Sequence, residues 1–216
     1  MDRFQFNEEK HEYLLDGKLL TGITSVLSVI AKPALIQWAA NEAVNYILEY
    51  GIEKAEEART AHRRKKEKAG DIGKEVHAAI EEWIKNKTEP SLNEQGMKMF
   101  NNFLDWTLKN KVKFLESEKK MYSEKYWIAG TCDFTCEIKG KKYIGDIKTG
   151  GIYDRIPFAQ TAGYRLMLEE MGEKDYNGSV VVNIKKDGEF DEKKDVYWSF
   201  DYKTDLDLFL AALTIY

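Results

Sequence analysis

Apolar residues recur along residues 71–110 at the spacing of helices that pack one face against a core. In residues 71–86 they follow the 3.6-residue period of an α-helix: Ile72, Val76, Ile80 and Trp83. A second helix is expected from Asn93 to about Asn110. Its predicted buried stripe is Met97, Phe100, Leu104 and Leu108.

The first part of the chain has a different pattern. Residues 4–6 and 11–15 have the composition of short strands, and Asp16-Gly17 is a two-residue turn that favours a hairpin. A short helical stretch is expected to begin at Thr24 or Ser25.

Two further helical segments are predicted before residue 71. Residues 33–50 form an amphipathic helix, and a charged helix over 52–68 is expected to end at Gly70. We expect residues 1–70 to be a hairpin and helical segment of the same domain as a core at 71–216.

After residue 112 the alternation changes to the period of β-strands. Three strands joined by turns near Lys125 and at Lys139-Gly140 are predicted at 113–124, 126–138 and 141–148. They are followed by a helix at 155–171, strands at 178–185 and 194–202, and a helix at 204–213. This order predicts an α/β fold with a mixed central sheet flanked by helices.

The composition restricts cofactors and location. No apolar run approaches the roughly 20 residues that cross a bilayer, and residues 1–17 are charged rather than apolar. We therefore expect an intracellular, cytoplasmic protein with no secretion signal and no membrane partner. Cys132 and Cys136 are too few for a four-cysteine iron–sulfur cluster and have the spacing of core residues. The sequence contains no GxxxxGK[ST] motif, so we expect no bound nucleotide.

Three charged residues in the strands are candidates for chemistry. Alternation puts Asp146 and Lys148 on one face of their strand, and a hairpin across Lys139-Gly140 would bring Asp133 near them. Converging carboxylates repel each other unless a proton or a cation lies between them. A hard cation such as Mg²⁺ or Mn²⁺ suits these ligands, and a lysine beside it can offset charge on a phosphate. The alternative is an ordinary surface ion pair, which contributes little.

Three more residues extend this set. Gln160 and Tyr164 lie four residues apart on one helix face, downstream of Lys148. His77 lies beside the apolar stripe of its helix, where a histidine is either a core residue or a metal ligand.

The net charge of −4 gives no overall reason to expect nucleic acid. Positive charge is nevertheless concentrated in RTAHRRKKEK, residues 59–68. The candidate DNA-binding residues in this segment are Arg59, Arg63, Arg64, Lys65, Lys66 and Lys68. Alternatively, upstream glutamates pair with these bases on a solvated helix face.

Four motifs in order resemble the PD-(D/E)XK nuclease superfamily. They are the helix with Gly73, His77 and Glu81, then GTCD ending at Asp133, GDIKT at 145–149, and QTAGY at 160–164. The match is closest to the RecB-type branch, which includes phage exonucleases and the mitochondrial genome maintenance exonuclease. The opening HEYLLDGKLLTGITSVL is similar to the N-terminal hairpin of the phage members.

The resemblance implies a role for each residue. Asp133, Asp146, the backbone carbonyl of Ile147 and His77 would hold Mg²⁺ or Mn²⁺. Lys148 would be the catalytic lysine, with Gln160 and Tyr164 as further catalytic residues. Glu81 would either ligate through water or pair with a neighbour.

The implied function is a metal-dependent DNA exonuclease, bacterial or phage-encoded. Its substrate would be single-stranded or partly single-stranded DNA ends, and a single-strand annealing protein or helicase is a candidate partner. The alternatives are a structure- or site-specific endonuclease of the same fold and a non-catalytic DNA-binding module.

Overall fold

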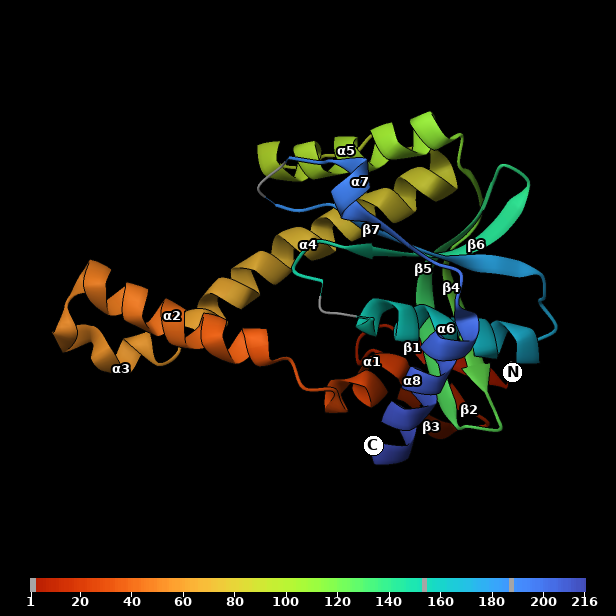
Figure 1. Ribbon diagram of the computed structural model, residues 1–216, viewed down its shortest axis with the longest axis horizontal. Helices are drawn as coiled ribbons and strands as arrows, with labels where there is room; N and C mark the ends of the chain where they lie inside the picture. The colour runs from red at the N-terminus through yellow and green to blue at the C-terminus, as the bar shows by residue number, and fades with distance from the viewer. Residues whose placement is uncertain (1–2, 153–154, 187–188) are drawn as a thin grey trace.

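The computed structural model describes residues 3–152, 155–186 and 189–216 (Figure 1). Its strands are β1 (Phe4–Asn7), β2 (Glu12–Leu15), β3 (Lys18–Gly22), β4 (Lys113–Ser123), β5 (Ile128–Ile138), β6 (Lys141–Lys148), β7 (Tyr176–Asn183) and β8 (Val196–Ser199). Its α-helices are α1 (Ile23–Val26), α2 (Pro33–Tyr50), α3 (Ala55–Ala58), α4 (Ala61–Asn86), α5 (Glu94–Asn110), α6 (Ile156–Glu170), α7 (Glu192–Asp195) and α8 (Tyr202–Ile215).

The strands form one mixed sheet. Its order is β1-β2-β3-β5-β6-β7-β8, and β4 pairs with β5 outside this path. The β3–β5 and β6–β7 pairs are parallel, and the other pairs are antiparallel. The prediction of an α/β fold with a mixed central sheet flanked by helices is confirmed.

Two hydrophobic cores lie on opposite faces of this sheet. Val76, Ile80, Phe100 and Phe103, from α4 and α5, pack against one face. Helices α6 and α8 cover the other face, as Figure 1 shows, and their core also takes in residues of α1. A smaller core joins the β1–β3 hairpins to β5 through Ala129.

Both predicted two-residue turns are confirmed. Asp16 and Gly17 have φ values of 49° and 76°, and Lys139 and Gly140 have φ values of 52° and 74°. Positive φ at both central positions is the geometry of hairpin turns that follow the natural twist of the strands. The second turn fixes the register of β5 against β6.

The predicted helix break at Gly70 is wrong. Helix α4 runs without interruption from Ala61 to Asn86, and the irregular point lies earlier, at Arg59 and Thr60. One glycine costs a helix only about 1 kcal/mol relative to alanine, which the helix formers on both sides can offset. The expected boundary between residues 70 and 71 therefore falls inside one helix.

The buried face of α5 differs in part from the prediction, and the two cysteines lie in different cores. In α5 the buried residues include Met99, Phe103 and Trp106, whereas Leu108 is 66% exposed. The predicted stripe is right in part, because Phe100 is buried and Leu104 packs against the same core, whereas Leu108 is exposed. The prediction that both cysteines are core residues is confirmed: Cys132 is buried in the core of α6, and Cys136 is buried with Phe134 in the core of α4 and α5.

Helices α2, α3 and the first half of α4 form an arm that projects from the body (Figure 1). No residue of α2 is buried. Within the described ranges, no single helix is long and apolar enough to cross a membrane. Ile23–Val29 and Pro33–Tyr50, bent by 82°, pass that test only as a pair.

Candidate active site

The two predicted acids meet on adjoining strands. Phe134 of β5 lies opposite Gly145 of β6, so the next step of the antiparallel register brings Asp133 beside Asp146. The carboxylate of Asp133 accepts a hydrogen bond from the backbone N–H of Ile147 at 2.5 Å. This bond fixes Asp133 against the strand that carries the other acid.

Asp146 is buried, with its side chain 2% exposed. Its Oδ1 accepts a hydrogen bond from Lys148 Nζ at 2.9 Å. Its Oδ2 lies 2.8 Å from the same nitrogen but accepts no hydrogen bond. Burial raises the pKa of Asp146 to about 6, with the charge of Lys148 opposing the shift and that of Asp133 adding to it.

Lys148 connects this acid to helix α6. Its ammonium also donates to Gln160 Oε1 at 3.1 Å, and Gln160 Nε2 donates to the Tyr164 hydroxyl at 2.7 Å. Burial favours a lower pKa for Lys148, but the carboxylates of Asp146 and Asp133 outweigh burial and raise that pKa. The lysine is therefore cationic and held by two partners.

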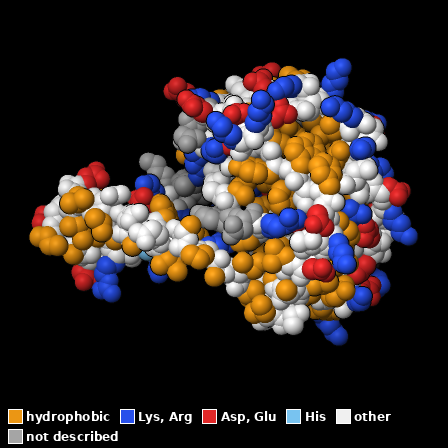
Figure 2. All heavy atoms as spheres, viewed as in Figure 1, with side chains coloured by type: hydrophobic (Ala, Val, Ile, Leu, Met, Phe, Trp, Pro, Cys, Tyr) orange, Lys and Arg blue, Asp and Glu red, His pale blue; other side chains and the backbone are white. Residues whose placement is uncertain are grey.

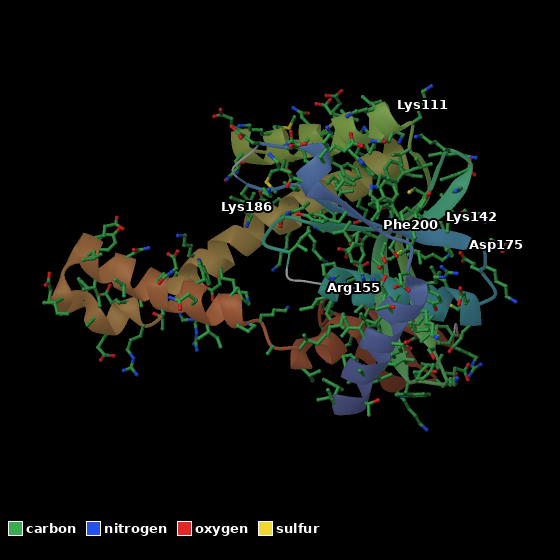
Figure 3. The ribbon with its side chains drawn as sticks, in the orientation of Figure 1. Lys111, Lys142, Arg155, Asp175, Lys186 and Phe200 are labelled. Atoms are coloured by element: carbon green, nitrogen blue, oxygen red, sulfur yellow. The ribbon has the colours of Figure 1, made fainter. Side chains whose placement is uncertain are left out.

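Close packing and an ion pair set the position of α6. A Cβ at Gly130 would lie 2.8 Å from the Tyr164 ring, so the glycine of the GTCD motif lets Tyr164 approach β5. Figure 3 labels Arg155. At the start of α6, this residue donates to the buried carboxylate of Asp205 in α8. The side chains that reach Lys148 thus stand on a fixed helix.

His77 approaches the site from α4. Its Nδ1 lies 3.9 Å from Asp133 Oδ1, and its side chain is 30% exposed. A Cβ at Gly73, one turn earlier, would lie 2.7 Å from the Thr149 hydroxyl, so that glycine lets α4 pack against the end of β6. Glu81, one turn later, forms an ion pair with Lys85. His77 therefore faces Asp133. The ion pair of Glu81 with Lys85 favours the second role expected for Glu81, which is pairing with a neighbour.

Glu118 of β4 was not predicted as a site residue. It lines a cavity together with Asp133, and burial raises its pKa to about 7, with repulsion from Asp133 and Glu81 adding to the shift. In the sequence it is one of several charges in KFLESEKK, and no local signal distinguishes it.

The donor atoms suit a hard divalent cation. Within the described part of the chain, no three His, Cys, Asp or Glu side chains already form a metal-binding group. Asp133 and Asp146 nevertheless converge, His77 lies next to Asp133, and the buried Oδ2 of Asp146 has no hydrogen-bond partner. This oxygen contacts Lys148 as an ion pair but accepts no hydrogen bond, and a divalent cation would give it a further partner and offset the repulsion between the two acids.

The predicted DNA-binding residues lie on the arm and differ in their partners. Arg59 pairs with Glu56, and Lys65 pairs with Glu42 of α2 at 2.7 Å. Arg64 donates to Thr60 and to the Glu57 carbonyl and lies over the Tyr46 ring.

The side chains of Arg63 and Lys66 are exposed, and they make no hydrogen bond or ion pair with a described residue. The side chain of Lys68 lies outside the described residues. Figure 2 shows the arm extending from the body, with apolar side chains on its surface beside the charges.

Comparisons with known proteins do not assign a family. No family of known proteins matches the sequence, and no curated protein matches it. One similar solved structure is the crystal structure of SSO0001, at 17% identity and a TM-score of 0.40, over 90% of this chain and 75% of that chain. A TM-score of 0.40 is too low to carry a conclusion about fold or function.

Proposed function

We propose that this chain is a metal-dependent DNA nuclease of the PD-(D/E)XK superfamily, RecB-type branch, which trims DNA ends. The observation that carries the proposal is the convergence of Asp133 and Asp146 with Lys148, which bonds to Asp146 and Gln160. A surface ion pair would leave the burial of Asp146 and the chain from Lys148 to Tyr164 unexplained.

Each residue has a role in phosphodiester hydrolysis. Asp133, Asp146, His77 and the carbonyl of Ile147 would hold Mg²⁺ or Mn²⁺, which when bound would acidify a water and polarise the phosphate. In the hydrolysis the water oxygen bonds to phosphorus and releases one proton to solvent, the bond from phosphorus to the 3′ oxygen breaks, and that oxygen takes up one proton from solvent. The product strand carries a 5′-phosphate.

Lys148 contributes a fixed positive charge near the reacting phosphate. The hydrogen bonds from its ammonium to Asp146 and Gln160 hold it in place before substrate arrives. A preorganised charge needs little rearrangement as negative charge develops on the phosphate oxygens. Tyr164 positions Gln160 and acts through it.

The arm provides the cationic surface that an acidic protein needs to hold DNA. The side chains of Arg63 and Lys66 have no partner among the described residues. The ring centroids of Tyr46 and Tyr50 lie 4.6 Å apart on the neighbouring helix. Basic side chains that alternate with aromatic rings suit single-stranded DNA, because the basic groups contact phosphates and the rings stack on nucleobases. Because no nucleotide-binding motif is present, a helicase or annealing partner would supply any strand separation.

The test is a cleavage assay with single-stranded and double-stranded linear DNA, each internally labelled, and with closed single-stranded circles, in Mg²⁺ and in Mn²⁺. Linear DNA should be degraded and circles spared. Asp146→Asn and Lys148→Met should abolish cleavage and remain folded by circular dichroism. The matched controls are Asp105→Asn and Lys98→Met, at exposed positions of α5, which should cut at the parent rate.

Two other outcomes favour the alternatives. Rapid cutting of circles would identify an endonuclease of the same fold. DNA binding without cleavage in either metal would identify a non-catalytic binding module. Full activity in Asp146→Asn would end the assignment to this superfamily.

A further inference from the structure

A cavity of about 460 Å³ adjoins the candidate active site. Asp133 and Gln160 form part of its wall, so its contents lie next to the proposed scissile phosphate. Most of the remaining wall comes from β2, β3, the start of α1 and the first part of β5, and His11, Glu118 of β4, Tyr164 of α6 and Tyr216 complete it. The elements β2, β3 and α1 lie in the lower half of Figure 1. Its volume is within the roughly 300–1,000 Å³ of small-molecule sites.

The charges on this wall exclude one class of ligand. Among the described residues that line the cavity none is Lys or Arg, whereas Glu12, Glu118 and Asp133 are acidic. A terminal phosphate placed there would face Glu12 and Glu118, and also Asp133 until a metal ion binds it, with no lysine or arginine of the described wall to offset them. Like charges brought together in this way oppose binding strongly.

The same wall suits an uncharged sugar and base. Hydroxyl groups of Thr21, Thr24 and Thr131 line it, and the Thr131 hydroxyl lies 2.9 Å from that of Tyr13, which ties the hairpin to β5. Hydroxyls and carboxylates bond readily to sugar hydroxyls and base edges. Leu19 and Tyr216, each more than half exposed, add apolar and aromatic surface that a base can contact.

We infer that this cavity binds the terminal nucleoside of the DNA strand in a form with a free hydroxyl end, and that it rejects an end bearing a phosphate. The inference rests on the proposed nuclease function. The free hydroxyl is either a 3′ or a 5′ hydroxyl, and the experiment distinguishes the two.

The experiment uses one single-stranded oligonucleotide with an internal label and three end states: hydroxyls at both ends, phosphate only at the 5′ end, and phosphate only at the 3′ end. Initial cleavage rates give kcat/KM for each in Mn²⁺ at mildly alkaline pH. Phosphate at the end that enters the cavity should lower kcat/KM by about tenfold or more. Phosphate at the other end should have no effect.

Variants of Glu118 test the cause. Glu118→Gln should reduce the discrimination, and Glu118→Lys should reverse it in favour of the phosphorylated end. Glu116→Gln, on the same strand and outside the cavity, should discriminate as the parent does. Equilibrium binding of the same oligonucleotides without metal, followed by fluorescence anisotropy, should show the same order.

The failure of this inference is distinct from failure of the nuclease assignment. No cleavage of any oligonucleotide would remove the proposed function. Cleavage that is indifferent to both end phosphates, or faster with either one, would leave the nuclease and overturn the cavity assignment. Discrimination that persists in Glu118→Gln and Glu118→Lys would overturn it as well.

Discussion

In the metal-free protein, the unfolding free energy should fall as pH rises because of Asp146. The Asp146→Asn variant should lack this fall. In the folded chain burial raises the pKa of Asp146 from an ordinary 3.8 to about 6. Between these values the folded state keeps the proton while the unfolded chain has released it. Stability therefore falls as pH rises through this window and stays low above pH 6. Asparagine has no proton to lose, so its contribution does not change with pH.

The magnitude follows from the size of the shift. About two pKa units at 1.36 kcal/mol each correspond to about 3 kcal/mol of unfolding free energy. That is a large part of the 5–15 kcal/mol typical of a whole domain. Glu118 titrates in an overlapping range, but it is present in both proteins and its contribution largely cancels in the difference.

The assay is urea unfolding of the parent and the Asp146→Asn variant, in chelator, across about pH 4 to 8. The parent should lose about 3 kcal/mol more than the variant across this range. Mn²⁺ added at neutral pH should then stabilise the parent by about 2.7 kcal/mol when present at one hundred times its Kd, and the variant much less. Identical pH slopes in the two proteins would refute the raised pKa of Asp146 and the cost attributed to its burial.

Four further predictions concern the metal ligands, the arm and the packing of α6. His77→Ala should weaken Mn²⁺ binding in calorimetric titration, because imidazole suits Mn²⁺, and unchanged affinity would return His77 to a structural role. In the parent, cleavage in Mn²⁺ should at least equal cleavage in Mg²⁺. Changing Arg63 and Lys66 together to Gln should flatten the slope of log affinity against log salt by roughly 0.7 for each lost single-strand phosphate contact; a parental slope would place the DNA track elsewhere. Gly130→Ala should push Tyr164 from β5, with about 1–3 kcal/mol of lost stability in thermal unfolding and slower cleavage, whereas a parental melting temperature would mean that the ring yields freely.

Local patterns were sufficient to predict most of the central site. The period-2 alternation and the turn at Lys139-Gly140 together predicted that Asp133 and Asp146 would be neighbours, and the structure brings them together. Lys148 and Gln160 also meet, although a loop separates them in the sequence. The contact between the two acids follows from a two-residue turn, whose geometry a sequence largely determines.

Other features depend on contacts between distant segments. The parallel pairing of Thr21 with Ile128 places the N-terminal hairpin beside the site, and no local pattern encodes it. The same contact puts Glu118 in the wall of a cavity rather than on an open strand. The uninterrupted course of α4 through Gly70 reflects the combined preference of its neighbours, which outweighs the signal of one residue.

Because α4 is continuous, its length sets the distance between the arm and the candidate active site. Arg63 on the arm and His77 at the site are fourteen positions apart on one helix, and a rise of 1.5 Å per residue separates them by about 21 Å along its axis. A strand that touches both positions spans about six nucleotides at the 3.4 Å spacing of B-form DNA, and fewer when it is stretched. If the chain is the proposed nuclease, DNA fragments shorter than this span would lose contact with the arm while they still reached the proposed metal ligands. Trimming would then slow at a residual DNA length that the helix sets, and shortening the helix would shorten that residual length.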